Sequence, residues 1–103
     1  MNQLERITLM EQYLDEAETI LKAYSESLKA YREIQPKLRE LAGYYSGNDW
    51  RKDFEDDEAG SLPADLKRGG LSDDAVYNLL SEDAEIQAET LETVAEIFRE
   101  GRF

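Results

Sequence analysis

Two residue types on which much protein chemistry depends are absent from this sequence. Its 103 residues include no cysteine and no histidine. Without cysteine, the chain has no disulfide bonds, thiolate metal sites or cysteine nucleophiles. Without histidine, it lacks the commonest general base and the commonest zinc ligand. No nucleotide-binding loop is present either. The sequence therefore predicts a protein that is not an enzyme, with no catalytic residues, no cofactor and no metal ligands.

Long hydrophobic runs are also missing. No apolar stretch approaches the length of about 20 residues that spans a bilayer. The first ten residues, MNQLERITLM, lack the basic segment and the apolar core of a signal peptide. We therefore expect a cytoplasmic protein with no membrane partner.

Basic residues are few compared with acidic ones. Lysine and arginine number 12, aspartate and glutamate number 24, and the formal net charge is -12. Nucleic acids and anionic membranes are bound by Lys/Arg surfaces, so we expect no nucleic-acid partner. Hydrophobic residues make up 41% of the chain, which is enough for one domain of this length to form a modest core.

Apolar residues between Gln3 and Arg32 follow a heptad pattern. Their intervals alternate between three and four residues, which predicts a helix with one continuous apolar face. The residues of this heptad face are Ile7, Met10, Leu14, Ala17, Leu21, Tyr24, Leu28 and Tyr31. We expect the face to form either the seam of a homodimeric coiled coil or the long arm of an intramolecular bundle.

Pro36 perturbs this helix, because proline removes a backbone hydrogen bond and disfavours helix at the preceding residue. The apolar pattern nevertheless resumes in a new phase and continues to Tyr45. We predict a long helix over residues 3–45, kinked near Pro36, with Gly47 in a left-handed conformation after its end.

Residues 48–71 form a connector that contains the only tryptophan of the chain. Its first half predicts a short helix that is capped by one of residues 48–49 and stopped by Gly60. Trp50 and Phe54 lie four residues apart and therefore share one side of that helix.

The second half of the connector predicts a still shorter helix over residues 64–68. Leu62-Pro63 fits a helix start, and Gly69-Gly70 fits its end. Lys67-Arg68 is the one locally basic point, and it lies where cations suit a helix C-terminus.

The C-terminal segment, residues 72–100, predicts another helix, with glutamates opposite its apolar side. Ser72-Asp73-Asp74 is a start signal, and Ser81 marks a point where the helix either breaks or continues. Gly101 is expected to end it, and the last two residues, Arg102 and Phe103, are expected to fray.

These patterns predict an all-α fold with a single domain over residues 1–103. We expect the long N-terminal helix, kinked near Pro36, to pack antiparallel on the C-terminal helix as a helical hairpin or bundle. The connector is expected to contribute short helices between them.

The centre of the chain holds a dense run of motifs: Tyr44-Tyr45, Trp50, Asp53-Phe54-Glu55, Asp57-Glu58, Gly60, Leu62-Pro63, Asp65-Leu66-Lys67-Arg68-Gly69, Leu71-Ser72, Asp74 and Val76-Tyr77. This run resembles the signature of a small bacterial family, domain of unknown function 4298. Its most specific part runs from Leu62 to Gly69, whereas Gly70 stands where the family is expected to have an apolar residue. The resemblance implies a short, acidic, single-domain bacterial protein without an assigned activity, and it supplies no catalytic residues.

Seven residues in and beside the connector form the predicted interaction surface. They are Tyr44, Trp50, Asp53, Asp65, Lys67, Arg68 and Tyr77. The leading hypothesis is a non-enzymatic protein–protein interaction module or small scaffold that binds an unidentified protein or a second copy of itself. Two alternatives stay open: an acidic decoy that imitates nucleic acid in a basic protein groove, and a carboxylate site for a divalent cation or small molecule in residues 53–65.

Overall fold

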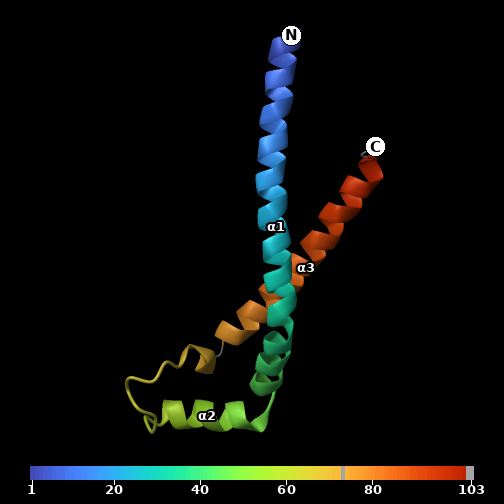
Figure 1. Ribbon diagram of the computed structural model, residues 1–103. Helices are drawn as coiled ribbons and strands as arrows, with labels where there is room; N and C mark the ends of the chain where they lie inside the picture. The colour runs from blue at the N-terminus through green and yellow to red at the C-terminus, as the bar shows by residue number, and fades with distance from the viewer. Residues whose placement is uncertain (73, 102–103) are drawn as a thin grey trace. The chain divides into compact units, whose positions relative to one another are not determined.

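The computed structural model describes residues 1–72 and 74–101, and the regular structure in these ranges is helical. The elements in chain order are α1 (Gln3–Tyr45), α2 (Asn48–Glu58), the 3-10 helix η1 (Gly69–Leu71) and α3 (Ala75–Glu100), as Figure 1 shows. The predicted all-α class, with long terminal helices and short helical segments between them, is confirmed. Two compact units make up the chain, Met1–Pro36 and Lys37–Phe103.

The first unit consists of one segment of α1. Asn2 starts the helix, because its Oδ1 accepts a hydrogen bond from the Glu5 N–H at 2.9 Å and its Nδ2 donates to Glu5 Oε1 at 2.6 Å. This reciprocal pair satisfies N-terminal groups that have no intrahelical partner. A single helix offers its side chains no second element within the unit, and the large apolar residues of the heptad face from Ile7 to Leu28 are 44–63% exposed.

Helix α1 continues through Pro36 to Tyr45, and its 43 residues cover the range expected from the sequence. The boundary between the two units falls at Pro36. This is the position where the backbone cannot donate a hydrogen bond to the preceding turn.

The second unit begins with the last turns of α1 and a tight turn into α2. The prediction of a left-handed Gly47 is wrong: its φ of -102° and ψ of 174° are extended, and it is the N-cap of α2. Asn48 and Asp49, the predicted caps, lie inside the helix instead. Glycine is favoured at position 47 for a steric reason, because a Cβ there would lie 3.2 Å from the carbonyl oxygen of Gly43.

Helix α2 ends at Glu58, and Gly60 follows with a φ of +74°. The Gly60 N–H donates to the Asp57 carbonyl at 3.0 Å, and the Ser61 N–H donates to the Asp56 carbonyl at 2.9 Å. This pattern is a Schellman motif, whose left-handed residue is most easily glycine. The predicted stop at Gly60 is therefore confirmed.

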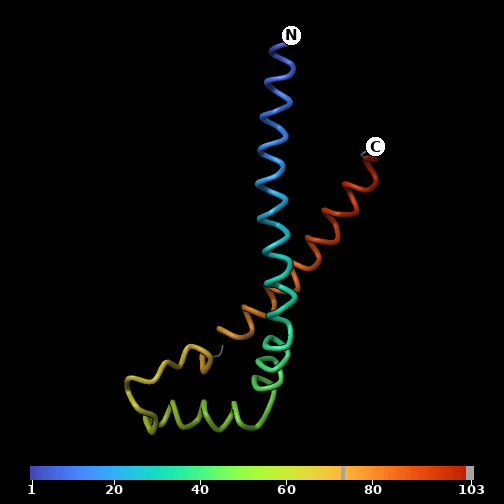
Figure 2. Tube along the Cα trace, in the orientation of Figure 1, coloured from blue at the N-terminus to red at the C-terminus, as the bar shows by residue number. Residues whose placement is uncertain are grey.

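The predicted helix over residues 64–68 is wrong. A single turn is present, in which the Leu66 N–H donates to the Pro63 carbonyl at 3.2 Å, and Gly69 and Gly70 belong to η1. Figure 2 shows this part of the trace, in yellow, as an open loop. The physical reason is the cost of helix nucleation, which five residues cannot offset with enough backbone hydrogen bonds.

Helix α3 begins close to the predicted start signal. The N-cap residue is Asp74, which makes no side-chain cap bond, and the Ser72 hydroxyl accepts a hydrogen bond from the Ala75 N–H at 3.0 Å. Of the same signal, Asp73 lies outside the described residues. The helix runs on through Ser81 without a break.

The end of α3 agrees with the expectation from the sequence. Gly101 has a φ of +68°, and its N–H donates to the Phe98 carbonyl at 3.3 Å. The expected fraying of Arg102 and Phe103 concerns residues outside the described part of the chain.

An aromatic cluster positions the connector. The Trp50 ring stacks on Phe54 with centroids 5.2 Å apart, and it meets Tyr45 edge-on at 5.1 Å. Trp50 Nε1 donates to the Gly70 carbonyl at 2.8 Å, which ties α2 to η1. Among the described residues Val76, in the first turn of α3, is the only buried one, with 3% of its surface exposed. The apolar core of the second unit is therefore small, and polar contacts contribute to the stability of this unit.

Candidate functional site

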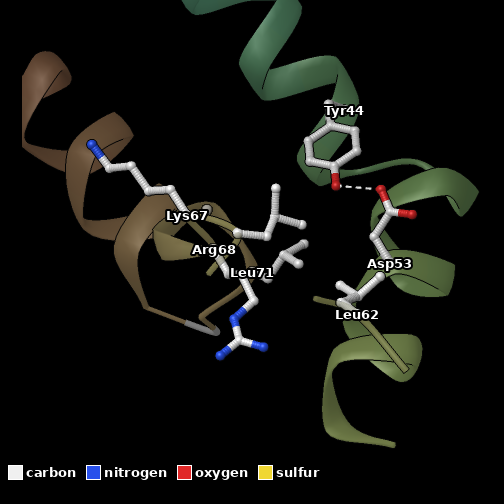
Figure 3. A pocket seen from close by; sticks show the side chains of 8 residues that line it. Tyr44, Asp53, Leu62, Lys67, Arg68 and Leu71 are labelled. Carbon is white, nitrogen blue, oxygen red and sulfur yellow. Dashed lines mark hydrogen bonds between the residues drawn. The ribbon is translucent and has the colours of Figure 1, made fainter. Parts of the chain in front are cut away.

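A hollow of about 360 Å³ lies between the end of α1, helix α2, the loop after α2, and η1. We call it the connector pocket (Figure 3). It is lined by Tyr44, Asp53, Leu62, Leu66, Lys67, Arg68, Gly70 and Leu71. All of these residues belong to the second unit. The pocket has a polar end, an apolar floor and two cations.

The polar end joins α1 to α2. The Tyr44 hydroxyl donates a hydrogen bond of 2.6 Å to Asp53 Oδ2, and both residues are half-buried. This bond to the Asp53 carboxylate, together with burial and the negative charges of Asp53 and Asp49, raises the pKa of Tyr44 to about 12. Tyr44 therefore keeps its proton at neutral pH and acts as a hydrogen-bond donor, which positions α2 against the end of α1.

The floor of the pocket is made by leucines of the connector. Leu62 and Leu71 are half-buried, and Leu66 is exposed. In Figure 3, Leu62 and Leu71 lie between the Tyr44–Asp53 pair and the two basic side chains. This arrangement gives an apolar side chain of a ligand a surface to pack on.

The two cations of the pocket have different environments. Arg68 Nη1 forms an ion pair with Asp57 Oδ1 of α2 at 3.0 Å, with side chains 35% and 24% exposed. Lys67 is exposed, and in Figure 3 its side chain extends away from the Tyr44–Asp53 pair. Arg68 therefore fastens the loop to α2, whereas Lys67 presents its charge to solvent.

The structure brings together four of the seven residues predicted for an interaction surface. Tyr44, Asp53, Lys67 and Arg68 line the connector pocket. The other three lie elsewhere: Trp50 in the aromatic cluster, Asp65 exposed in the loop, and Tyr77 61% exposed on α3.

Sequence reasoning did not include the leucines of the connector in the predicted interaction surface and so missed them as pocket residues. Leu62, Leu66 and Leu71 are spaced four and five residues apart. In a stretch that is not one continuous helix, this spacing gives no sign of a shared surface. A concentration of leucines in a segment rich in glycine and acids was the only available signal.

The acidic residues of the described chain are not arranged as a metal centre. No group of three or more carboxylates there is placed to hold a metal ion. On α2, Asp56 instead accepts a hydrogen bond of 3.1 Å from Lys52, and this contact raises the pKa of Lys52. In the same described ranges, no helix has an apolar stretch long enough to cross a membrane.

A family model, described as domain of unknown function (DUF4298), matches residues 7–93. Comparison with curated proteins gave no match, and comparison with solved structures gave none either. The match covers both the heptad face and the connector pocket, and most of the chain. The chain therefore belongs to the family of the domain of unknown function DUF4298.

Proposed function

We propose that this protein is a non-enzymatic interaction module of the bacterial cytoplasm, a small scaffold that associates with a second copy of itself through the heptad face. The observation that carries the proposal is the exposure of that face: its large apolar residues from Ile7 to Leu28 are 44–63% exposed. Helices gain most of their stability by packing an apolar face against a partner. A contiguous face of this kind favours association with another helix.

Residue chemistry supports a binding role rather than catalysis. The chain has no histidine or cysteine, and the polar end of the connector pocket is occupied by a hydrogen bond between Tyr44 and Asp53. A phenol with a pKa near 12 is a poor proton donor or acceptor for chemistry at neutral pH.

Light scattering at low and high salt tests the self-association. We expect a mass twice that of the chain at both salt concentrations, because apolar burial is not screened by ions. Leu21→Glu should yield a monomer, since it places a charge in the seam, whereas Lys22→Glu introduces the same side chain one position away and should remain a dimer. A monomeric wild-type protein would contradict the proposal.

The connector pocket supports a second, heterologous contact. Its leucine floor and the exposed Lys67 are complementary to a peptide segment that carries a bulky apolar side chain next to an acidic one. Selection from a random peptide library should enrich such segments. Lys67→Glu should weaken the selected peptides, whereas Lys52→Glu on the exposed side of α2 should not. Enrichment without acidic residues would contradict this specificity.

Helix α3 favours a second candidate function, that of an acidic decoy for a nucleic-acid-binding protein. Its glutamates at positions 85, 89, 92, 96 and 100 are all exposed. Rows of carboxylates can imitate the phosphates that basic grooves recognise. Under this candidate, binding to a basic protein would be competed by duplex DNA and would weaken steeply with salt. Binding that is insensitive to salt would argue against it.

A further inference from the structure

The residues that border the heptad face carry information about how two copies pair. With Ile7 at heptad position a, the g positions hold Arg6, Tyr13, Ile20 and Ser27, and the e positions hold Glu11, Glu18, Ser25 and Arg32. Charges at e and g set the orientation and the partners of coiled coils. In a parallel pair, each g residue lies near the e residue that comes five positions later on the other helix.

Parallel, in-register pairing brings opposite charges together. It places Arg6 beside Glu11 of the second copy, and symmetry repeats this contact on the other side of the seam. The other three g–e combinations contain no pair of like charges. All eight layers of the heptad face from Ile7 to Tyr31 then meet their own counterparts, within the first unit of each copy.

Antiparallel pairing is less favourable on the same criteria. The register that aligns all eight layers places Glu18 against Glu18 of the second copy, which is a like-charge contact. A register shifted by one heptad brings Glu11 to Arg32 instead. It also places Met10 opposite Gln35, so that one layer becomes polar. Neither antiparallel register combines a full apolar seam with complementary charges.

We propose that two copies of the chain pair through the heptad face as a parallel, in-register coiled coil, held in that register by reciprocal Arg6–Glu11 ion pairs. The inference rests on the proposed self-association and adds its orientation, register and specifying contact. Each copy in such a dimer contributes one connector pocket. A parallel dimer is thus bivalent for a partner that itself carries two binding segments.

Charge reversal at the border residues tests the ion pair. Arg6→Glu alone and Glu11→Arg alone should each raise the dimer dissociation constant about tenfold in low salt, because each replaces two attractive contacts by two repulsive ones. The double variant Arg6→Glu/Glu11→Arg should return to within about threefold of wild type. Glu26→Arg, a matched reversal at an outward-facing position, should change little. Sedimentation equilibrium measures these constants.

Cysteine cross-linking tests the register independently of affinity. Because the chain has no native cysteine, Leu14→Cys introduces a single thiol into one layer of the seam. In a parallel, in-register dimer the two thiols meet, so mild oxidation should give a covalent dimer. Cysteine at the outward-facing position 26 should not cross-link.

The outcomes separate this inference from the proposed function. A dimer that resists Leu14→Cys cross-linking, or one that is rescued by Glu11→Arg/Arg32→Glu instead, overturns the parallel register and leaves self-association intact. A chain that remains monomeric at every concentration overturns both. Failure of the Arg6→Glu/Glu11→Arg variant to recover affinity overturns the ion pair.

Discussion

Replacing Tyr44 by phenylalanine should destabilise the second unit by about 1 kcal/mol. The substitution removes one hydroxyl and with it the 2.6 Å hydrogen bond to Asp53 that joins α1 to α2. Bonds to a charged group contribute about 1.5–3 kcal/mol when they are well shielded. A pKa raised from 10.0 to about 12 would correspond to about 2.7 kcal/mol under the same condition. Both residues are only half-buried, and water can replace the hydroxyl at Asp53. We therefore expect a loss of about 1 kcal/mol, below both of these values.

Urea unfolding followed by the fluorescence of Trp50 measures this loss. Trp50 is the only tryptophan, and its ring, on α2, contacts Tyr45 and Phe54, so its emission reports the second unit. With a slope of about 1–2 kcal/mol per molar, the urea midpoint should fall by about 0.5–1 M. Tyr77→Phe is the matched control, since that tyrosine is 61% exposed. It should unfold like wild type.

Alkaline pH should abolish the difference between wild type and Tyr44→Phe. The Tyr44 hydroxyl holds its proton more tightly in the folded than in the unfolded chain, since its pKa is raised from 10.0 to about 12. Its contribution to stability is therefore fully present below about pH 10 and is lost as the pH rises through about 12. The free energy difference between the two proteins should shrink across this window. A Tyr44→Phe protein with the wild-type midpoint at neutral pH, or a difference that persists above pH 12, would refute the reasoning.

Three further substitutions, one of them paired with a control at Gly69, test other parts of the fold. Arg68→Ala should cost about 0.5–1 kcal/mol in urea unfolding, and less in high salt, because its ion pair with Asp57 is partly exposed; a loss that salt does not reduce would contradict this. Gly60→Ala should cost about 1 kcal/mol, since φ is +74° there. Gly69→Ala, where φ is not positive and a Cβ would meet nothing within 4 Å, should be neutral, and equal effects at both glycines would contradict the Schellman assignment. Pro36→Ala should raise the melting temperature followed by circular dichroism, by restoring a backbone hydrogen bond worth up to about 3 kcal/mol within α1; a lower melting temperature would show that the proline is needed there.

The long helices were predictable because their signals are local and repeated. The heptad spacing and the absence of Gly and Pro up to Arg32 specify helix at every turn. Glycines at positions 60 and 101 mark the helix ends where the backbone becomes left-handed. Each of these signals depends on neighbours within four residues, so no knowledge of distant contacts was required.

The short elements of the connector were not predictable in the same way. Gly47 follows a helix end, as left-handed glycines do, but its backbone is extended. Glycine is favoured there because of the close approach to the Gly43 carbonyl. Residues 64–68 had a start and an end signal but too few hydrogen bonds to form a helix. The bond from Trp50 Nε1 to the Gly70 carbonyl, across twenty residues, determines where η1 lies.

By itself, the sequence determined the all-α class, the extent of α1, the ends of α2 and α3, and the apolar heptad face, because helix periodicity and glycine conformations are local properties of the chain. Only the tertiary structure decided which connector residues line one pocket. Tyr44 reaches Asp53, and Arg68 reaches Asp57, through turns whose geometry depends on contacts between segments far apart in sequence. Each of those contacts contributes little free energy, and their combined effect cannot be read from the spacing of residues in the sequence.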